Sequence, residues 1–176
     1  IDIYGFEHDG LQYKGRLKGH NSVIYKVDFS VDEKYLQTCS QAYELIFYDL
    51  STMAAVAQPR SLRDVKWATF TSLLGWDVQG IWPLESDGSD VNSVARSKSG
   101  KLLATAEGSG EVRVYQFPCV GGGLDRNGSL VRRPESVNGH GHSEQVGEVE
   151  WSTNDQFLFS TGGSDLTLFQ WKVTHA

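Results

Sequence analysis

Cysteine, methionine, proline and long apolar runs are all scarce in this sequence of 176 residues. The two cysteines, Cys39 and Cys119, are too few for a disulfide framework or a thiolate zinc site, which favours a reducing compartment and so a cytoplasmic location. No stretch approaches the roughly 18 consecutive apolar residues that a membrane helix requires, so we expect no membrane partner.

Positive charge is also in short supply. The chain has 16 Lys and Arg against 22 Asp and Glu, a formal net charge of −6. Binding to phosphates depends on clustered Lys and Arg, and the only adjacent basic pair is Arg132-Arg133, so we expect no nucleic-acid partner. The N-terminus lacks an initiator Met and both the basic and the apolar region of a signal peptide, which indicates a piece of a longer chain.

Short β-branched and aromatic segments are abundant, whereas helix signals are few. These segments alternate with clusters of Gly, Asp, Ser and Asn, the residues that turns favour. Among them are VIYKVDFS, YLQTCS, ELIFYDL, KLLATAE, EVRVYQF, FLFSTGG and LTLFQW. The pattern predicts an all-β chain.

The segments fall into an internal repeat of three copies. Each copy has a polar start, a valine seven residues later, a serine ten residues from the start and a closing aromatic residue. The starts are His20, Asp87 and His142, the valines Val27, Val94 and Val149, the serines Ser30, Ser97 and Ser152, and the aromatics Tyr48, Tyr115 and Trp171. Three consecutive strands plus a variable segment that can supply a fourth are typical of a propeller blade.

We expect a fragment of a larger WD-repeat β-propeller, with about three blades, because propellers need at least four blades to close. The predicted parts are 1–18, the last strand of a preceding blade and a linker; 19–60, a blade; 61–119, a blade with an apolar insertion; 120–140, a Gly-rich loop and connecting strand; and 141–176, the C-terminal blade. Within them, we expect Arg63–Pro83 to form an extra strand pair and residues 120–133 a mobile surface loop.

Parts of the repeat resemble the WD-repeat signature, in which a His, a Ser or Thr, an Asp and a Trp form a buried hydrogen-bond network. The third copy carries all four, as His142, Thr161, Asp165 and Trp171. The first copy keeps His20 and Thr38 but has Ala42 and Tyr48 at the other two positions, and the middle copy has Asp87, Thr105, Ser109 and Tyr115.

Two chemical roles are alternatives to a structural role for these residues. A metal could be held by histidines, and a Ser-His-Asp triad could form from Ser160, His142 and Asp165. The repeat already accounts for His20 and His142 without a metal, and no nucleophile elbow accompanies the serine. We therefore expect no catalytic residue, no metal and no cofactor.

A propeller without chemistry of its own is a binding architecture. The loops joined by the His and Asp of the network, those before the first strand and those between the second and third strands, should emerge on the same face of the propeller. Candidate partner-facing residues there are Gln41, Tyr43, Glu107 and Ser164. An ordinary solvated turn explains each of them equally well.

Four longer motifs resemble the echinoderm microtubule-associated protein-like family, specifically the C-terminal propeller of its tandem atypical propeller domain. They are Phe29–Glu44, Arg63–Pro83, Ser86–Ser97 and Ser160–Val173, and the likeness spans nearly the whole chain. The second and third are far more specific than any Gly-His or Trp-Asp dipeptide.

The resemblance implies a non-enzymatic protein of the cytoplasm and cytoskeleton, whose propellers engage tubulin or microtubules. The family's N-terminal coiled coil and basic region, on which attachment to the polymer mainly depends, are not in this sequence. Other protein partners are compatible with the blades. The alternative function is a general WD-repeat scaffold for a signalling or ubiquitin-ligase complex.

Overall fold

The computed structural model describes residues 1–8, 10–82, 86, 90–121, 127, 129, 131–132 and 134–174. The chain divides into two compact units, residues 1–72 and 73–176, and each is considered by itself. In the described residues no helix is both long and apolar enough to cross a membrane. Most of the loop expected over residues 120–133 lies outside the described residues.

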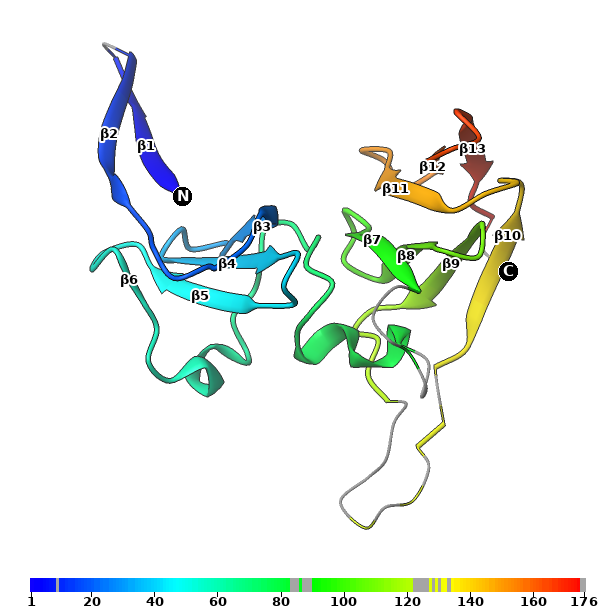
Figure 1. The fold of residues 1–176 in the computed structure, drawn as a ribbon, viewed down its shortest axis with the longest axis horizontal. Coiled ribbons are helices and arrows are strands. Elements are labelled where there is room, and N and C mark those ends of the chain that lie inside the picture. The colour runs from blue at the N-terminus through cyan, green and yellow to red at the C-terminus, as the bar shows by residue number, and fades with distance from the viewer. Residues whose placement is uncertain are drawn as a thin grey trace. The chain divides into compact units, whose positions relative to one another are not determined.

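Thirteen strands and two short 3-10 helices make up the regular structure of the described residues, and the strands are short antiparallel segments (Figure 1). They are β1 (Asp2–Glu7), β2 (Gly10–Arg16), β3 (Ile24–Phe29), β4 (Tyr35–Ser40), β5 (Leu45–Asp49), β6 (Ala54–Ala55), β7 (Val91–Arg96), β8 (Leu102–Glu107), β9 (Glu111–Gln116), β10 (Ser136–His140), β11 (Val146–Trp151), β12 (Phe157–Gly162) and β13 (Leu168–Lys172).

The strands after the first two form three up-and-down sheets, β3 to β6, β7 to β10 and β11 to β13, which we name blades A, B and C. The first strand of every blade has the same irregularity in its pairing, between Ile24 and Lys26, Val91 and Ser93, and Val146 and Glu148. A bulge repeated at one position marks a common structural unit. The predicted all-β propeller-blade architecture is confirmed.

The turn between the first two strands is also the same in all three blades. Its leading serine, Ser30, Ser97 or Ser152, accepts a hydrogen bond from the backbone N–H five residues later, at 2.9, 3.1 and 3.0 Å. The fourth residue of each turn has a positive φ, as in Glu33, Gly100 and Asp155. The serines that the repeat predicts are therefore turn-closing residues.

Strands β1 and β2 pair with each other as a hairpin, where the sequence predicted one strand and a linker. Gly10 opens the second strand with a φ of 110°, a conformation that suits glycine. The hairpin packs on blade A, where Ile1 and Ile3 contact a core that includes Leu36 and Tyr48.

The apolar insertion Arg63–Pro83 is not a strand pair, and that prediction was wrong; Pro83 itself lies outside the described residues. A short 3-10 helix occupies Trp76–Ile81 instead, and another, Pro59–Leu62, directly precedes the insertion. In the first unit the insertion makes a single bridge, between Trp67 and Ser30. Trp67 is buried against Phe47, with ring centroids 5.8 Å apart, so its apolar character reflects packing onto blade A.

The insertion is fastened to blade A by the carboxylate of Asp28, which is 1 % exposed. It accepts hydrogen bonds from Thr69 Oγ1 at 2.6 Å, from Thr71 N at 3.0 Å and from Ser72 N at 3.2 Å. The amide of Gln37 on the neighbouring strand donates to it at 3.0 Å. A buried carboxylate with this many donors holds the segment against the sheet without a basic partner among these contacts.

Blades B and C pack face to face within the second unit. Val149, Trp151 and Leu158 of blade C lie in one core with Ala95 and Ala104 of blade B. Polar contacts fix the pair further. Trp151 Nε1 donates to the carbonyl of Ala95 at 2.9 Å, and the carboxylate of Asp155 accepts from the backbone N–H groups of Lys98 and Ser99, both at 2.7 Å.

We predict that Asp28→Ala destabilises the protein by about 3 kcal/mol, because it leaves buried backbone N–H groups without acceptors. A chain of this size should then melt at a temperature lower by roughly 6 to 12 °C. Differential scanning calorimetry measures the shift. Asp64→Ala, at an exposed carboxylate of the same insertion, is the matched control, and equal losses in the two variants would contradict the anchoring role of Asp28.

Candidate interaction surface

The histidine before blade A is tied to the second strand of that blade. The His20 side chain is 2 % exposed. Its Nε2 lies 2.6 Å from Thr38 Oγ1, and its Nδ1 lies 2.9 Å from Glu44 Oε2. Because a carboxylate only accepts, Nδ1 carries the proton of this contact. The structure thus brings together the two residues that the sequence selected, and adds a carboxylate.

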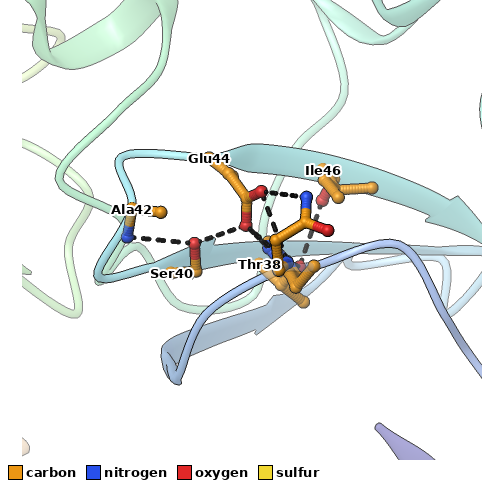
Figure 2. A network of polar contacts seen from close by, with 7 residues as sticks. Thr38, Ser40, Ala42, Glu44 and Ile46 are labelled. Atoms are coloured by element: carbon orange, nitrogen blue, oxygen red, sulfur yellow. Dashed lines mark hydrogen bonds and ion pairs between the residues drawn. The ribbon is translucent and has the colours of Figure 1, made fainter.

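Glu44 is the centre of this network, which the sequence missed (Figure 2). Its carboxylate also accepts from Ser40 Oγ at 2.7 Å and from Asn21 Nδ2 at 2.8 Å. Hydrogen bonds from Ser40, then Asn21, then His20 lower the pKa of Glu44 from 4.5 to about 2. The acidic position expected two residues earlier holds Ala42, and the longer glutamate side chain reaches the histidine from the start of β5.

In blade C the network is a directed chain of hydrogen bonds. Trp171 Nε1 donates to Ser160 Oγ at 2.8 Å, and Ser160 Oγ lies 2.8 Å from His142 Nε2. His142 Nδ1 lies 2.9 Å from Asp165 Oδ2. Because an indole only donates, Ser160 Oγ accepts from Trp171 and can donate its own proton in a hydrogen bond to His142 Nε2. His142 Nδ1–H in turn donates to the Asp165 carboxylate.

The predicted member Thr161 does not belong to this network. Ser160 is buried and takes that place, whereas Thr161 is exposed, because successive side chains of β12 point to opposite faces. The sequence held the signal for this correction. His20 and Thr38 are 18 residues apart, and the same separation from His142 gives Ser160.

Asp165 bonds both to the histidine and to a residue of its own turn. Burial raises the pKa of this carboxyl, but the backbone N–H and hydroxyl of Thr167, together with His142, outweigh burial and hold the pKa below its ordinary value. The Thr167 hydroxyl donates to Asp165 Oδ1 at 2.9 Å. The turn between β12 and β13 is therefore held by the same carboxylate that orients His142.

Blade B departs from this pattern. The predicted partner-facing residue Glu107 is 5 % exposed, so that prediction was wrong. Its carboxylate accepts a hydrogen bond from Thr105 Oγ1 and lies 4.0 Å from Arg113 Nε. Asp87, the expected first member of the middle copy, lies outside the described residues. The Thr105 hydroxyl here donates to a buried acid, whereas the corresponding hydroxyls of blades A and C contact a histidine.

Ser160, His142 and Asp165 have the connectivity of a catalytic triad. However, Ser160 is 1 % exposed, and its hydroxyl oxygen accepts a hydrogen bond from the Trp171 indole. A substrate therefore has no access to this hydroxyl. Among the described residues, no three His, Cys, Asp or Glu side chains are grouped to hold a metal. The geometry is that of a structural network.

The remaining candidates lie on exposed turns between the second and third strands. In blade A, Gln41 is exposed and Tyr43 is 55 % exposed. In blade C, Ser164 is exposed, and beside it stands Leu166, which is 90 % exposed and which the sequence argument missed. Each turn is attached to a neighbouring loop by a backbone hydrogen bond. Gln41 N donates to Val23 O at 2.9 Å, and Gly163 N donates to Gln145 O at 3.0 Å.

Comparison with known proteins shows which family these blades resemble. The model of the echinoderm microtubule-associated protein second beta-propeller matches residues 1–173. Human echinoderm microtubule-associated protein-like 1 is 38 % identical over 98 % of this chain, and this covers 20 % of that protein. The 77 kDa echinoderm microtubule-associated protein of Strongylocentrotus purpuratus is also 38 % identical over 98 % of this chain and is covered for 24 % of its length.

The chain thus spans about a fifth to a quarter of the length of these curated relatives. Among solved structures, a chain of the mitotic checkpoint complex aligns with a TM-score of 0.57 at 16 % identity, over 97 % of this chain and 54 % of that one. At this identity, the likeness shows the propeller fold alone.

We predict that Ser160→Ala lowers the free energy of unfolding by about 2 kcal/mol, because it leaves His142 and Trp171 without their shared partner in the interior. Thr161→Val, which also deletes one hydroxyl, should change it by less than about 0.5 kcal/mol. Chemical denaturation of both variants measures the difference. Ser160→Thr, the residue type at Thr38, should restore stability, and a larger loss in the Thr161 variant would contradict the assignment.

We predict that Glu44 makes the protein sensitive to acid. Its pKa is depressed in the folded state, so its stabilisation is fully present above the unfolded value of 4.5 and is lost as pH falls toward about 2. Melting temperatures at pH 7, 5, 4 and 3 measure this loss. Glu44→Gln should be less stable at pH 7 and should lose less on acidification, and parallel curves for the two proteins would refute the assignment.

Proposed function

The chain belongs to the echinoderm microtubule-associated protein family, and from this premise we propose that it is a non-enzymatic binding module for tubulin or microtubules. The observation that carries the proposal is the family match over residues 1–173. The relatives are named as microtubule-associated proteins, which supports a place in the cytoplasm on the cytoskeleton.

The charge of the chain limits how such binding can work. A net charge of −6 gives no general attraction to an acidic polymer surface. Arg132, half of the only adjacent basic pair, is exposed and bonded to Glu135 at 2.6 Å. We therefore propose that the contact is made by uncharged and apolar groups of the turns, with little electrostatic contribution.

Rigid blades suit this role. The His20 and His142 networks hold the turns between the second and third strands from inside the protein. The exposed residues of these turns are therefore already ordered before a partner binds. Pre-ordered contact groups reduce the conformational entropy lost on association. The general scaffold for a signalling or ubiquitin-ligase complex remains the alternative that absence of tubulin binding would favour.

We predict that the chain co-sediments with stabilised microtubules or co-elutes with αβ-tubulin dimers, and that raising the salt from 50 to 300 mM changes the affinity by no more than about threefold. Arg132→Ala should bind like the unmodified chain. Loss of binding at 300 mM salt or in the Arg132 variant would show a charge-driven contact. No binding to either form of tubulin at 50 mM salt would overturn the proposed function.

A further inference from the structure

Tyr43 occupies a backbone conformation that suits glycine. Its φ is 57°, and its N–H donates to the carbonyl of Ser40 at 3.1 Å. The corresponding residue in the turn of blade B is Gly110, with a φ of 86° and the equivalent bond to the carbonyl of Glu107 at 3.2 Å. A side chain crowds the backbone in this left-handed region, so blade A carries a tyrosine where glycine fits without strain.

Two of the other side chains in this left-handed region have evident uses inside the protein. Met53, with a φ of 55°, packs on the core formed by Leu36 and Tyr48. Asp155, with a φ of 57°, binds the backbone of the neighbouring turn in blade B. The Tyr43 side chain, by contrast, remains 55 % exposed.

Blade C shows the same combination independently. Leu166 has a φ of 53° in the turn between β12 and β13, and its side chain is 90 % exposed. Tyr43 directly precedes Glu44, and Leu166 directly follows Asp165, the two carboxylates that bind the buried histidines. In each unit, an exposed apolar side chain thus projects from a turn fixed by the internal network.

We propose that Tyr43 and Leu166 are contact anchors for the protein partner, each taken up by an apolar pocket on tubulin; this inference rests on the proposed function. Strain retained at an exposed apolar side chain points to use outside the fold. A tyrosine offers a large, rigid surface with a polar tip, which suits a pocket with a polar rim. In the first unit, Val23 is 62 % exposed, and its carbonyl is bonded to Gln41 beside the tyrosine.

The test separates stability from binding in one variant. Tyr43→Gly removes the anchor and relieves the left-handed strain, so its melting temperature should not fall, while its affinity for αβ-tubulin should fall by about tenfold or more. Leu166→Gly should behave in the same way. Calorimetry and co-elution with purified αβ-tubulin provide the two measurements.

Glu33→Gly is the matched control. Glu33 has a φ of 60° and is exposed in the opposite turn of blade A, so this variant relieves the same strain without removing an apolar group. Its tubulin affinity should be unchanged. Equal loss of affinity in Glu33→Gly and Tyr43→Gly would show a backbone effect and overturn the inference.

The results for the anchor variants and for the unmodified chain decide between the inference and its alternatives. A lower affinity with an undiminished melting temperature supports the anchors. Unchanged affinity in Tyr43→Gly and Leu166→Gly, or a melting temperature that falls together with the affinity, overturns the inference and leaves the proposed function intact. Failure of the unmodified chain to bind αβ-tubulin overturns the proposed function, and the assignment of tubulin-contacting anchors with it.

Discussion

The covering of a blade face by a neighbouring segment is the constraint on which this fold depends. A short sheet with apolar groups on two sides is stable only between neighbours. In the second unit the large Val149 and Trp151 of blade C meet the small Ala95, Ala104 and Ala106 of blade B. The indole nitrogen of Trp151 bonds to a backbone carbonyl of blade B, so the contact is apolar with its polar atom satisfied.

Blade A meets the same constraint with different chemistry. Its positions equivalent to the three alanines hold Asp28, Gln37 and Cys39, as the matching strand pairs show. The insertion covers this face, and its backbone at Thr71 and Ser72 brings N–H groups that need acceptors. A carboxylate supplies them, and Cys39 lies 2.6 Å from the Ser72 hydroxyl. Polar residues on a buried face are thus matched to the backbone N–H and hydroxyl groups of the segment that covers it.

The repeat in the sequence was enough to predict the blades, because strand alternation and turn serines are local signals. Selection of Thr161 in place of Ser160 placed one network residue on the wrong face, since one step along a strand reverses the side chain. Glu44 and Glu107 depended on which turn side chains fold inward, which spacing does not encode. The insertion Arg63–Pro83 shows the same limit, because apolar composition indicates burial and leaves the backbone conformation open.

The two turns of blades A and C combine opposite demands on neighbouring residues. Glu44 and Asp165 face inward and satisfy a buried histidine, which fixes the turn. Tyr43 and Leu166 next to them face outward in a conformation that Gly110 adopts without strain in blade B. Internal stability alone would favour glycine at all three positions. If Tyr43 and Leu166 are the proposed contact anchors, the difference between the blades reflects their use outside the fold, and the histidine networks hold the turns in place for it.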